Sequence, residues 1–195
     1  SIDYTITIDG DTLKPNSDGI YTPTFGTYII KASKPGYRCF RTELTIADDA
    51  EGDQNCIIEM VKAGENGWDG TTLSEAELKD GVYQISNGAE LAWFAAKVNG
   101  GDYTIAAKLV NDIDLCGYDW TPIGGDKSKL AYQGIFEGDG HTVDGLYIHN
   151  KKTYQALFGY IANSRISGIT VDASPKRSAF SIIITVALGT LIPTS

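Results

Sequence analysis

Both histidines of the chain, His141 and His149, lie in one short stretch of sequence, residues 132–150. Acidic residues accompany them in or near this stretch: Glu137, Asp139, Asp144 and Asp126. Histidine beside carboxylates is typical of metal sites and of general acid–base pairs. If the elements that carry these residues bring their side chains together, the chain can be an enzyme. If they hold them apart, the residues belong to a scaffold.

Two further sets of residues have side chains that suit a ligand. Asp112 and Asp114 lie two apart on a predicted strand, so they share a face and could bind a cation, as in a carbohydrate-active enzyme. An outward pair of aspartates is more often solvated surface. Five aromatic residues could instead stack on sugar rings in a carbohydrate-binding module: Tyr118, Trp120, Tyr132, Tyr147 and Tyr154.

The composition limits the classes of partner. The chain has 195 residues, 42% of them hydrophobic, and a net charge of -9, which is typical of a globular protein. Nucleic acids and anionic membranes need a basic surface, so this charge argues against both. The longest apolar run, residues 179–192, is too short to cross a bilayer as a helix, so no membrane insertion is expected. The chain begins within a predicted strand, as a mature or excised fragment would.

The three cysteines, Cys39, Cys56 and Cys116, lack the paired spacing of a zinc site. No metal and no cofactor is therefore expected. Cys39 and Cys56 either form a disulfide within the first domain or serve as small buried hydrophobic residues. The sequence leaves both alternatives open.

Residues 1–63 predict a small β-sandwich. "YTITID" alternates apolar and polar residues, as a half-buried strand does, and "GIYTP", "GTYIIKAS", "FRTELTIAD" and "NCIIEMV" follow as further strands. Because each strand has one apolar face, two sheets must pack together to bury those faces. On "GTYIIKASKPGYRCFRTELTIADD" and the closing "IIEM", this segment resembles small immunoglobulin-like modules related to carboxypeptidase regulatory domains. That resemblance implies a spacer or presentation module.

Residues 64–80 are polar and rich in glycine, and they predict a linker to a second domain, 81–195. Trp68 is the exception in this linker, and we expect it to pack on the second domain. After a short strand, "GVYQI", an amphipathic helix is predicted over 87–99. Ser86 or Asn87 begins it, Gly100 and Gly101 end it, and its apolar stripe consists of Leu91, Phe94, Ala95 and Val98.

Two segments of the second domain resemble each other with a period of 22 to 23 residues. "YQGIFEGDGHTVDGLYI" aligns with "YQALFGYIANSRISGITV", and "VNDIDL" upstream repeats the second half of the pattern. Short strands that recur at this spacing predict a right-handed parallel β-helix, with the helix 87–99 covering its N-terminal opening. The alignment stacks three apolar pairs in the interior: Ile135 with Leu157, Leu146 with Ile169, and Ile148 with Val171.

The repeat assigns the histidines and acids to the scaffold. In this alignment His141, Asp139 and Gly140 lie in a turn, and Asp144 takes a polar position. His149 follows the last inward residue and would lie at a turn or outward. None of these residues needs to face another. We therefore expect no catalytic, cofactor-binding or metal site, and the sequence names no ligand-binding residue.

Four segments of the second domain together resemble the GLUG-motif β-helix proteins of bacterial surfaces. They are "DGVYQISNGAELAWFAAKVN", "AAKLVNDIDLCGYDWTPIGG", "YQGIFEGDGHTVDGLYI" and "ALFGYIANSRISGITV", and the repeat itself is similar to 156–159 followed by Ile166, Gly168 and Val171. Ala156 departs from the usual first glycine. The resemblance implies that Trp120 and Pro122 in "WTPIG" are structural, and it ends after Asp172.

These observations predict an all-β protein: an N-terminal β-sandwich, then a short right-handed parallel β-helix with one N-terminal capping helix, atypical or truncated after 172. The resemblance implies a secreted or cell-surface bacterial protein, adhesin-like and non-catalytic. It would contact a host or microbial glycan or a surface protein. The alternative is a carbohydrate-binding module or an accessory part of a carbohydrate-active β-helix enzyme. No motif of a zinc peptidase, a serine hydrolase or a P-loop is present in the sequence.

Overall fold

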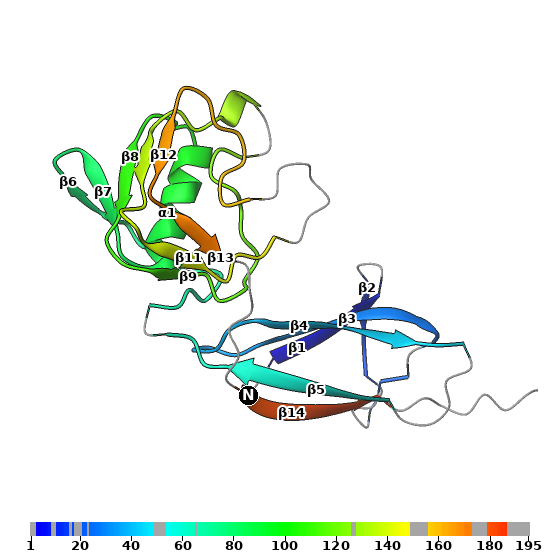
Figure 1. The fold of residues 1–195 in the computed structure, drawn as a ribbon. Coiled ribbons are helices and arrows are strands. Elements are labelled where there is room, and N and C mark those ends of the chain that lie inside the picture. Colours follow the sequence, from blue (N-terminus) through cyan, green and yellow to red (C-terminus); the bar gives the residue numbers. More distant parts are fainter. Residues whose placement is uncertain are drawn as a thin grey trace, which may run out of the picture. The chain divides into compact units, whose positions relative to one another are not determined.

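A computed structural model describes most of the chain, which divides into two compact units (Figure 1). The first unit comprises Ser1–Pro35, Cys39–Lys62 and Arg177–Ser195, and the second comprises Gly36–Arg38 and Ala63–Lys176. The described residues are 3–8, 11–15, 17, 21–22, 24–48, 54–64, 66–125, 128–148, 156–172 and 179–186. Strands predominate, and the described residues contain one α-helix, so the predicted mostly-β class is confirmed.

The first unit consists of two antiparallel sheets. One sheet has the strand order β2-β1-β3-β4, formed by β1 (Asp3–Ile8), β2 (Asp11–Leu13), β3 (Gly26–Ser33) and β4 (Phe40–Ile46). The other pairs β5 (Gln54–Val61) with β14 (Ala179–Val186). Alternation along β3 buries Tyr28, Ile30 and Ala32, which is the period-2 pattern that predicted this strand.

Two features of the first unit differ from the sequence prediction. The strand expected at "GIYTP" is not formed at Tyr21 or Thr22, and β2 is the strand that pairs with β1 at one edge of the sheet. The apolar segment Ala179–Val186 pairs with β5 in this unit rather than continuing the second domain. Its sequence is rich in β-branched residues, which suits an antiparallel partner for the apolar β5, and it has none of the turn residues of a further repeat.

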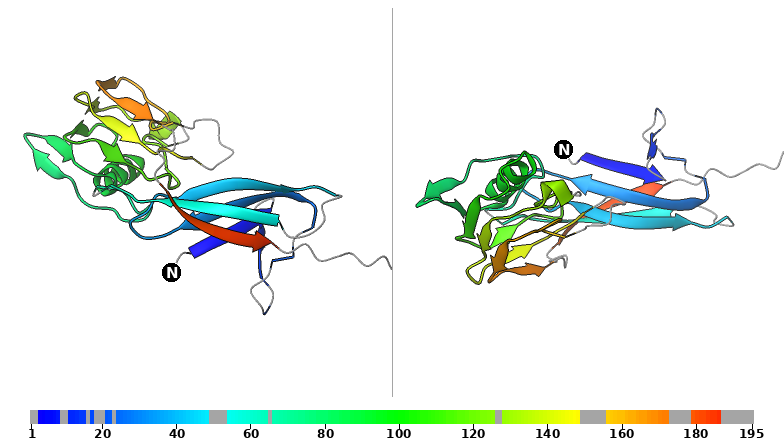
Figure 2. Two further views of the ribbon diagram at one scale, coloured as in Figure 1. Left: turned by 60° about the horizontal axis from the view of Figure 1, so that its bottom comes forward. Right: turned by 90° about the horizontal axis from the view of Figure 1, so that it is seen from above.

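The second unit is built mainly from parallel strands in two sheets (Figure 2). One sheet has the order β12-β10-β8-β7-β6, and the other has the order β13-β11-β9. The strands are β6 (Glu77–Lys79), β7 (Val82–Ile85), β8 (Ala106–Leu109), β9 (Ile113–Asp114), β10 (Ile135–Glu137), β11 (Thr142–Asp144), β12 (Arg165–Ser167) and β13 (Thr170–Asp172). A 3-10 turn, η1, covers Ser128–Leu130. We call the strand pairs β8–β9, β10–β11 and β12–β13 the three layers of the parallel stack.

The register of the parallel stack differs from the predicted one. Phe136 pairs with Ala107 and Ile166, and Val143 pairs with Ile113 and Val171. The separation of paired residues along the chain is therefore longer than the predicted period, and it varies from layer to layer. The predicted period is wrong, and so are the three predicted pairs. Instead of Leu157, Ile135 pairs with Arg165 and is 45% exposed.

The reason is the length of the turns between the two strands of each layer. Three, four and two residues separate β8 from β9, β10 from β11, and β12 from β13. The sequence alignment matched Val143 with Ile166 because both precede a polar residue and a glycine, although these two residues belong to different sheets. The identical tripeptides Thr142–Asp144 and Thr170–Asp172, which pair in register, are the sequence signal of the actual arrangement.

The helix α1 (Gly88–Asn99) follows β7 and agrees with the prediction. The Oδ1 atom of Asn87 accepts a hydrogen bond from the Glu90 amide at 3.0 Å, and a Glu90 carboxylate oxygen accepts one from the Ser86 amide at 2.6 Å. These reciprocal bonds satisfy amide groups at the start of the helix that have no partner within it. At the other end, Gly100 and Gly101 donate to helix carbonyls and end the helix.

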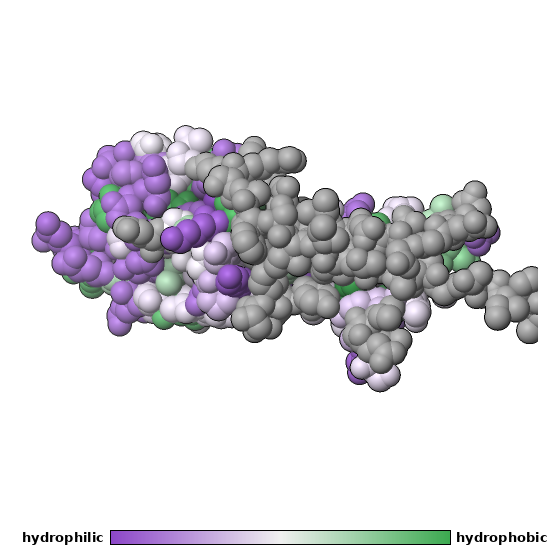
Figure 3. Space-filling view, turned by 90° about the horizontal axis from the view of Figure 1, so that it is seen from below, coloured by the Kyte–Doolittle hydropathy of each residue, from purple (hydrophilic) through white to green (hydrophobic). Residues whose placement is uncertain are grey.

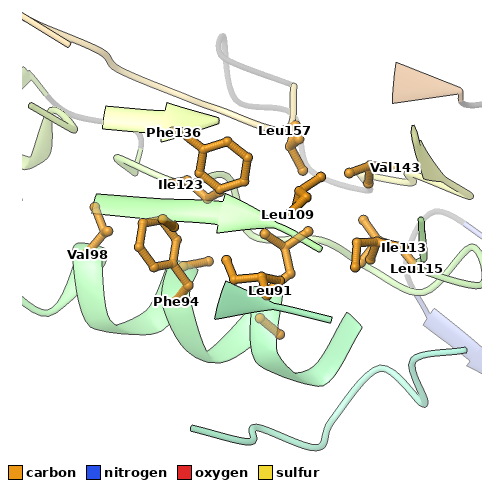
Figure 4. Close-up of a cluster of buried hydrophobic side chains, with 14 of the residues drawn as sticks. Leu91, Phe94, Val98, Leu109, Ile113, Leu115, Ile123, Phe136, Val143 and Leu157 are labelled. Atoms are coloured by element: carbon orange, nitrogen blue, oxygen red, sulfur yellow. The ribbon is translucent and has the colours of Figure 1, made fainter. Parts of the chain in front are cut away.

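The core of the second unit lies between α1 and the strands (Figure 4). Leu91, Phe94 and Val98 point from the helix toward the strands and are completely buried, and Ala95 of the same predicted stripe is 3% exposed. The strands and their connections supply the opposite side: Leu109, Ile113, Leu115, Ile123, Phe136, Val143 and Leu157. The stripe is therefore buried within the second unit, and the covering of an N-terminal β-helix opening by this helix stays a prediction.

The segment predicted as a linker also belongs in part to this core. Trp68 is 7% exposed, packs edge-to-face on Trp120 with ring centroids 5.8 Å apart, and donates from its indole nitrogen to the Thr72 carbonyl. Gly67 forms a parallel bridge with Asp114, so the backbone here extends the sheet of β9. The prediction for Trp68 is confirmed. Within the described part of the chain, no helix is long and apolar enough to traverse a membrane.

Candidate functional site

A row of three aspartates runs across the layers of the parallel stack. Asp144 pairs with Asp114 on one side and with Asp172 on the other, so the three residues occupy the same position in successive layers. The backbone repeats at this position as well. The amides of Trp68, Leu115 and Gly145 donate to the carbonyls of Asp114, Asp144 and Asp172, each at 2.9 Å. Stacked carboxylates repel one another, so a stable row needs a cation or a proton.

Arg38 supplies the positive charge for two of these aspartates. Its Nη1 atom lies 2.6 Å from an Asp114 carboxylate oxygen and 3.4 Å from an Asp144 carboxylate oxygen. The side chains of Arg38 and Asp144 are 10% and 6% exposed, and that of Asp114 is 22% exposed. A cation held between two carboxylates at this depth offsets their desolvation and their mutual repulsion. We call these three residues the Arg38 cluster.

Two residues beside the Arg38 cluster have left-handed backbone conformations. Gly145 has φ +68°, and a Cβ atom there would lie 2.5 Å from an Arg38 guanidinium nitrogen and 2.9 Å from the Cys116 amide nitrogen. Only glycine therefore fits without moving the arginine. Cys116 has φ +55°, and its amide donates to Asp114 Oδ1 at 2.8 Å.

The Cys116 thiol is buried next to this carboxylate. Burial raises the pKa of Cys116 to about 12, and the charge of Asp114 contributes to this rise against the opposing effect of Arg38. The thiolate is the nucleophilic form, so this cysteine is held in its unreactive state at neutral pH. Its position is that of a packing residue.

Three of the residues that opened the sequence analysis, Glu137, Asp139 and His141, lie on the solvent side of the stack, in pairs between layers. His141 Nδ1 is 3.2 Å from Asp112 Oδ1, and the same oxygen accepts a hydrogen bond from the Thr142 amide at 2.9 Å. Lys108 contacts Asp139 at 2.8 Å, and Arg165 contacts Glu137 at 2.6 Å. We call these three contacts the exposed pairs.

Each exposed pair joins residues of two successive layers. The hydrogen bond with Lys108 lowers the pKa of Asp139, and the same bond raises the pKa of Lys108, so both stay charged at neutral pH. The contact of His141 with Asp112, a residue of the other candidate set, was not predicted. The two residues are distant along the chain and had different predicted roles, and only the observed register brings them together.

Other candidate residues are outside this arrangement or outside the described residues. Asp126, His149 and Tyr154 lie outside the described residues, as does the side chain of Cys56, so the pairing of Cys56 with Cys39 stays a prediction. Asp112 and Asp114 do not act as a pair: the first contacts His141 in the solvent, and the second contacts Arg38.

The aromatic residues proposed as sugar platforms are mainly structural. Trp120 is 3% exposed and donates to the Leu157 carbonyl at 3.1 Å, as expected for a packing role. Tyr132 is completely buried, stacks on Phe158 and donates to the Ile105 carbonyl. Burial raises the pKa of Tyr132. Tyr118 and Tyr147 are half-buried, so the described members of this set form no common exposed face.

Asp69 was not singled out from the sequence, yet its carboxylate is strongly bound. It accepts hydrogen bonds from the amides of Thr71 and Thr72 at 2.8 and 2.7 Å, and from the Thr72 hydroxyl at 2.5 Å. Partial burial on its own would raise the pKa of Asp69, but the bonds from Thr72 and Thr71 outweigh it and hold the pKa at about 2. This turn fixes the chain just after Trp68, and its sequence signal is the Asx turn of "DGTT".

The charged side chains that join layers of the stack form two sets, the Arg38 cluster and the exposed pairs. Figure 3 shows that hydrophilic residues (purple) predominate on the described surface of the second unit in that view. Within the described ranges, no group of three histidine, cysteine or acidic side chains is arranged to hold a metal ion. No protein-family model, no curated protein and no solved structure matches this chain.

Proposed function

We propose that this chain is a non-catalytic adhesion or scaffold protein, secreted by a bacterium or held at its surface, whose second unit displays a rigid surface for contact with a glycan or a protein. One observation carries the proposal. The side chains best suited to chemistry bind one another between layers: Arg38 with Asp114 and Asp144, and His141 with Asp112. Charged groups used in this way hold layers together and are not directed at a common substrate position.

In this proposal the second unit is a short right-handed parallel β-helix of the GLUG type, and the first unit is an immunoglobulin-like β-sandwich. Three successive parallel layers support the β-helix. Further support comes from the segment 156–159, "ALFG", which follows the backbone of "PIGG": Phe158 bridges to Ile123, and the Gly159 amide donates to the Ile123 carbonyl at 2.8 Å. A Cβ atom at Gly159 would clash with the Gly125 carbonyl oxygen, so the glycine of this motif permits the close approach.

The proposal is tested by incubating the purified chain with panels of polysaccharides and peptides while measuring both turnover and binding. We expect saturable binding to at least one surface glycan or protein, and no turnover. Turnover that is lost in Asp112→Asn or His141→Ala would contradict the proposal. Glu77→Gln, at an exposed position on β6, controls for the general effect of removing a surface charge.

Glycan binding is favoured over protein binding by a second observation, at Trp93 of α1, at the edge of the core. Trp93 is half-buried, and its ring meets that of Tyr83 edge-to-face with centroids 5.1 Å apart. Lys97 Nζ lies 5.6 Å from the centre of the Trp93 ring. A half-exposed aromatic pair beside charged hydrogen-bonding groups suits stacking on a sugar ring. Trp93→Ala should abolish glycan binding, whereas Tyr103→Ala, at another half-buried aromatic residue, should retain it.

A further inference from the structure

The last layer of the parallel stack exposes apolar side chains. We call residues 156–172, which contain β12 and β13, the terminal layer. Val171 and Ile161 are 43% and 52% exposed, and Ile166 is partly exposed. Exposed apolar residues are common when scattered singly, but these three lie in one layer and at positions that are interior in the layer before.

The preceding layer shows what these positions normally do. Val143, which pairs with Val171, is completely buried, as is Phe136, which pairs with Ile166. Tyr132, which bridges to Ile161, is also completely buried. Three positions therefore change from buried to partly or largely exposed in the final layer. The core of the parallel stack opens at this end.

The backbone at this end suits the addition of another strand. β12 and β13 are the last strands of their two sheets in the described part of the chain. An edge strand presents amide and carbonyl groups that can pair with a further strand. The segment Ala179–Val186 does not extend these sheets, because it pairs over its whole length with β5.

The opposite end of the second unit is closed in a different way. There β6 pairs with β7 in an antiparallel hairpin, and α1 buries its apolar stripe in the core. Leu78 on β6 is 57% exposed there, but as a single residue rather than as three positions of one layer. If the terminal layers of two molecules were in contact, each would cover the exposed apolar residues of the other.

We propose that the terminal layer is an interface for a second copy of this chain, bound tail to tail about a two-fold axis. Charge supports a partner of this kind. The terminal layer carries one basic and one acidic residue, Arg165 and Asp172, so its formal charge is zero in a chain of net charge -9. Two copies can therefore meet here without the repulsion that other acidic surfaces of the chain would cause.

The register of the interface follows from the symmetry. A two-fold axis through Ile166 pairs the two β12 strands in antiparallel fashion and places each Arg165 opposite Ser167 of the other copy. Ile166 meets its own counterpart, and Val171 and Ile161 become covered. An isologous contact of this kind closes after two molecules and forms no filament.

The first test measures the oligomeric state of the full chain by sedimentation equilibrium over a wide concentration range. We expect a monomer–dimer equilibrium that Val171→Lys weakens at least about tenfold, because the lysine would bring a charge into an apolar interface. Leu78→Lys is the matched control, since Leu78 is 57% exposed on β6 at the other end. Ile161→Lys is a second variant at the interface, used if Val171→Lys does not fold by circular dichroism.

The second test separates the proposed interface from effects within one molecule. Ser167 is exposed and pairs with Glu137 within the chain, whereas in the dimer it faces Arg165 of the other copy. Ser167→Asp should strengthen dimerisation by about two- to fivefold while lowering the melting temperature of the monomer, and Ser167→Lys should do the reverse. A wild-type chain that stays monomeric at all concentrations, or a dimer insensitive to both lysine variants at Val171 and Ile161, would overturn the proposal.

Discussion

The Arg38 cluster and the exposed pairs use the same chemistry in two environments of the second unit. Both join charged side chains of neighbouring layers at 2.6 to 3.4 Å. The side chains of the Arg38 cluster are 6 to 22% exposed, whereas those of the exposed pairs are 31 to 76% exposed. Water screens the second set and hardly reaches the first. Contacts of similar length are therefore expected to contribute differently to the free energy of unfolding. The more deeply buried contacts should contribute more.

The largest effect is expected from Arg38→Met. Removing the guanidinium leaves Asp114 and Asp144 buried without their shared cation, so we expect the free energy of unfolding to fall by about 3–5 kcal/mol. Urea denaturation followed by tryptophan fluorescence measures it, because all three tryptophans, Trp68, Trp93 and Trp120, lie in the second unit.

Arg165→Met is the matched control for this change, since it removes the same group from an exposed pair and should cost less than about 1 kcal/mol. Adding Asp144→Asn to Arg38→Met should recover part of the loss, because one buried charge is removed with the other. Equal losses for the two arginine variants would show that burial does not separate the two sets.

Gly145→Ala tests how tightly the surrounding backbone holds Arg38. The left-handed backbone costs about 1–2 kcal/mol for a residue other than glycine, and the added methyl group displaces the guanidinium as well. We expect a total loss of about 2–3 kcal/mol in the same denaturation experiment, which is less than the loss from removing Arg38.

Gly140→Ala measures the cost of placing alanine in a left-handed backbone conformation without a steric contact. Gly140 has φ +86°, but a Cβ atom there would meet nothing within 4 Å. Its alanine variant should therefore lose only the conformational part. If both alanine variants lost the same free energy, the contact between Gly145 and Arg38 would have no energetic weight.

The pH dependence of stability tests Asp69, a carboxylate held by hydrogen bonds rather than by a cation. Its folded pKa of about 2 lies below the ordinary value of 3.8, so it stabilises the fold above the ordinary pKa, and this contribution is lost as the pH falls from about 4 to about 2. Because the side chain is exposed, we expect at most about 1 kcal/mol. Asp69→Asn should flatten this part of the pH profile, and a profile identical to wild type would refute the assignment.

His141→Ala is expected to have the smallest effect, under about 1 kcal/mol. Its contact with Asp112 is exposed, so raising the salt concentration should remove even this difference, while the effect of Arg38→Met should persist. Thermal melts of both variants at low and high salt provide the measurement. A large, salt-independent loss for His141→Ala would place it with the buried set.

Local patterns in the sequence predicted the elements well, because those patterns act within a few residues. Alternation predicted β3, and the capping residues with the apolar stripe predicted α1. The relation between elements was harder. The turns between the strands of a layer differ in length, which changes the spacing from layer to layer, so a search for one constant period matched strands of different sheets.

The candidate sites were predicted less completely than the elements. The assignment of Asp139 and Asp144 to the scaffold followed from the sequence repeat, but their partners depended on the observed register. Arg38 is 76 residues from Asp114 along the chain, and no local pattern points from one to the other. The repeated "TVD" would have given the register of the last two layers, and with it part of the row of aspartates. The arginine that binds two members of the row would still have required the structure.

The opening of the core at the terminal layer also sets an order for folding. Each layer pairs with the layer before it only after a long loop has closed, and α1 lies against the first layers, where apolar burial is complete. Nucleation there costs the least loop-closure entropy for the area that it buries. The stack should then grow toward Asp172 and fray from that end, so that amide protons of β12 and β13 exchange with deuterium far sooner than those of β7 and β8.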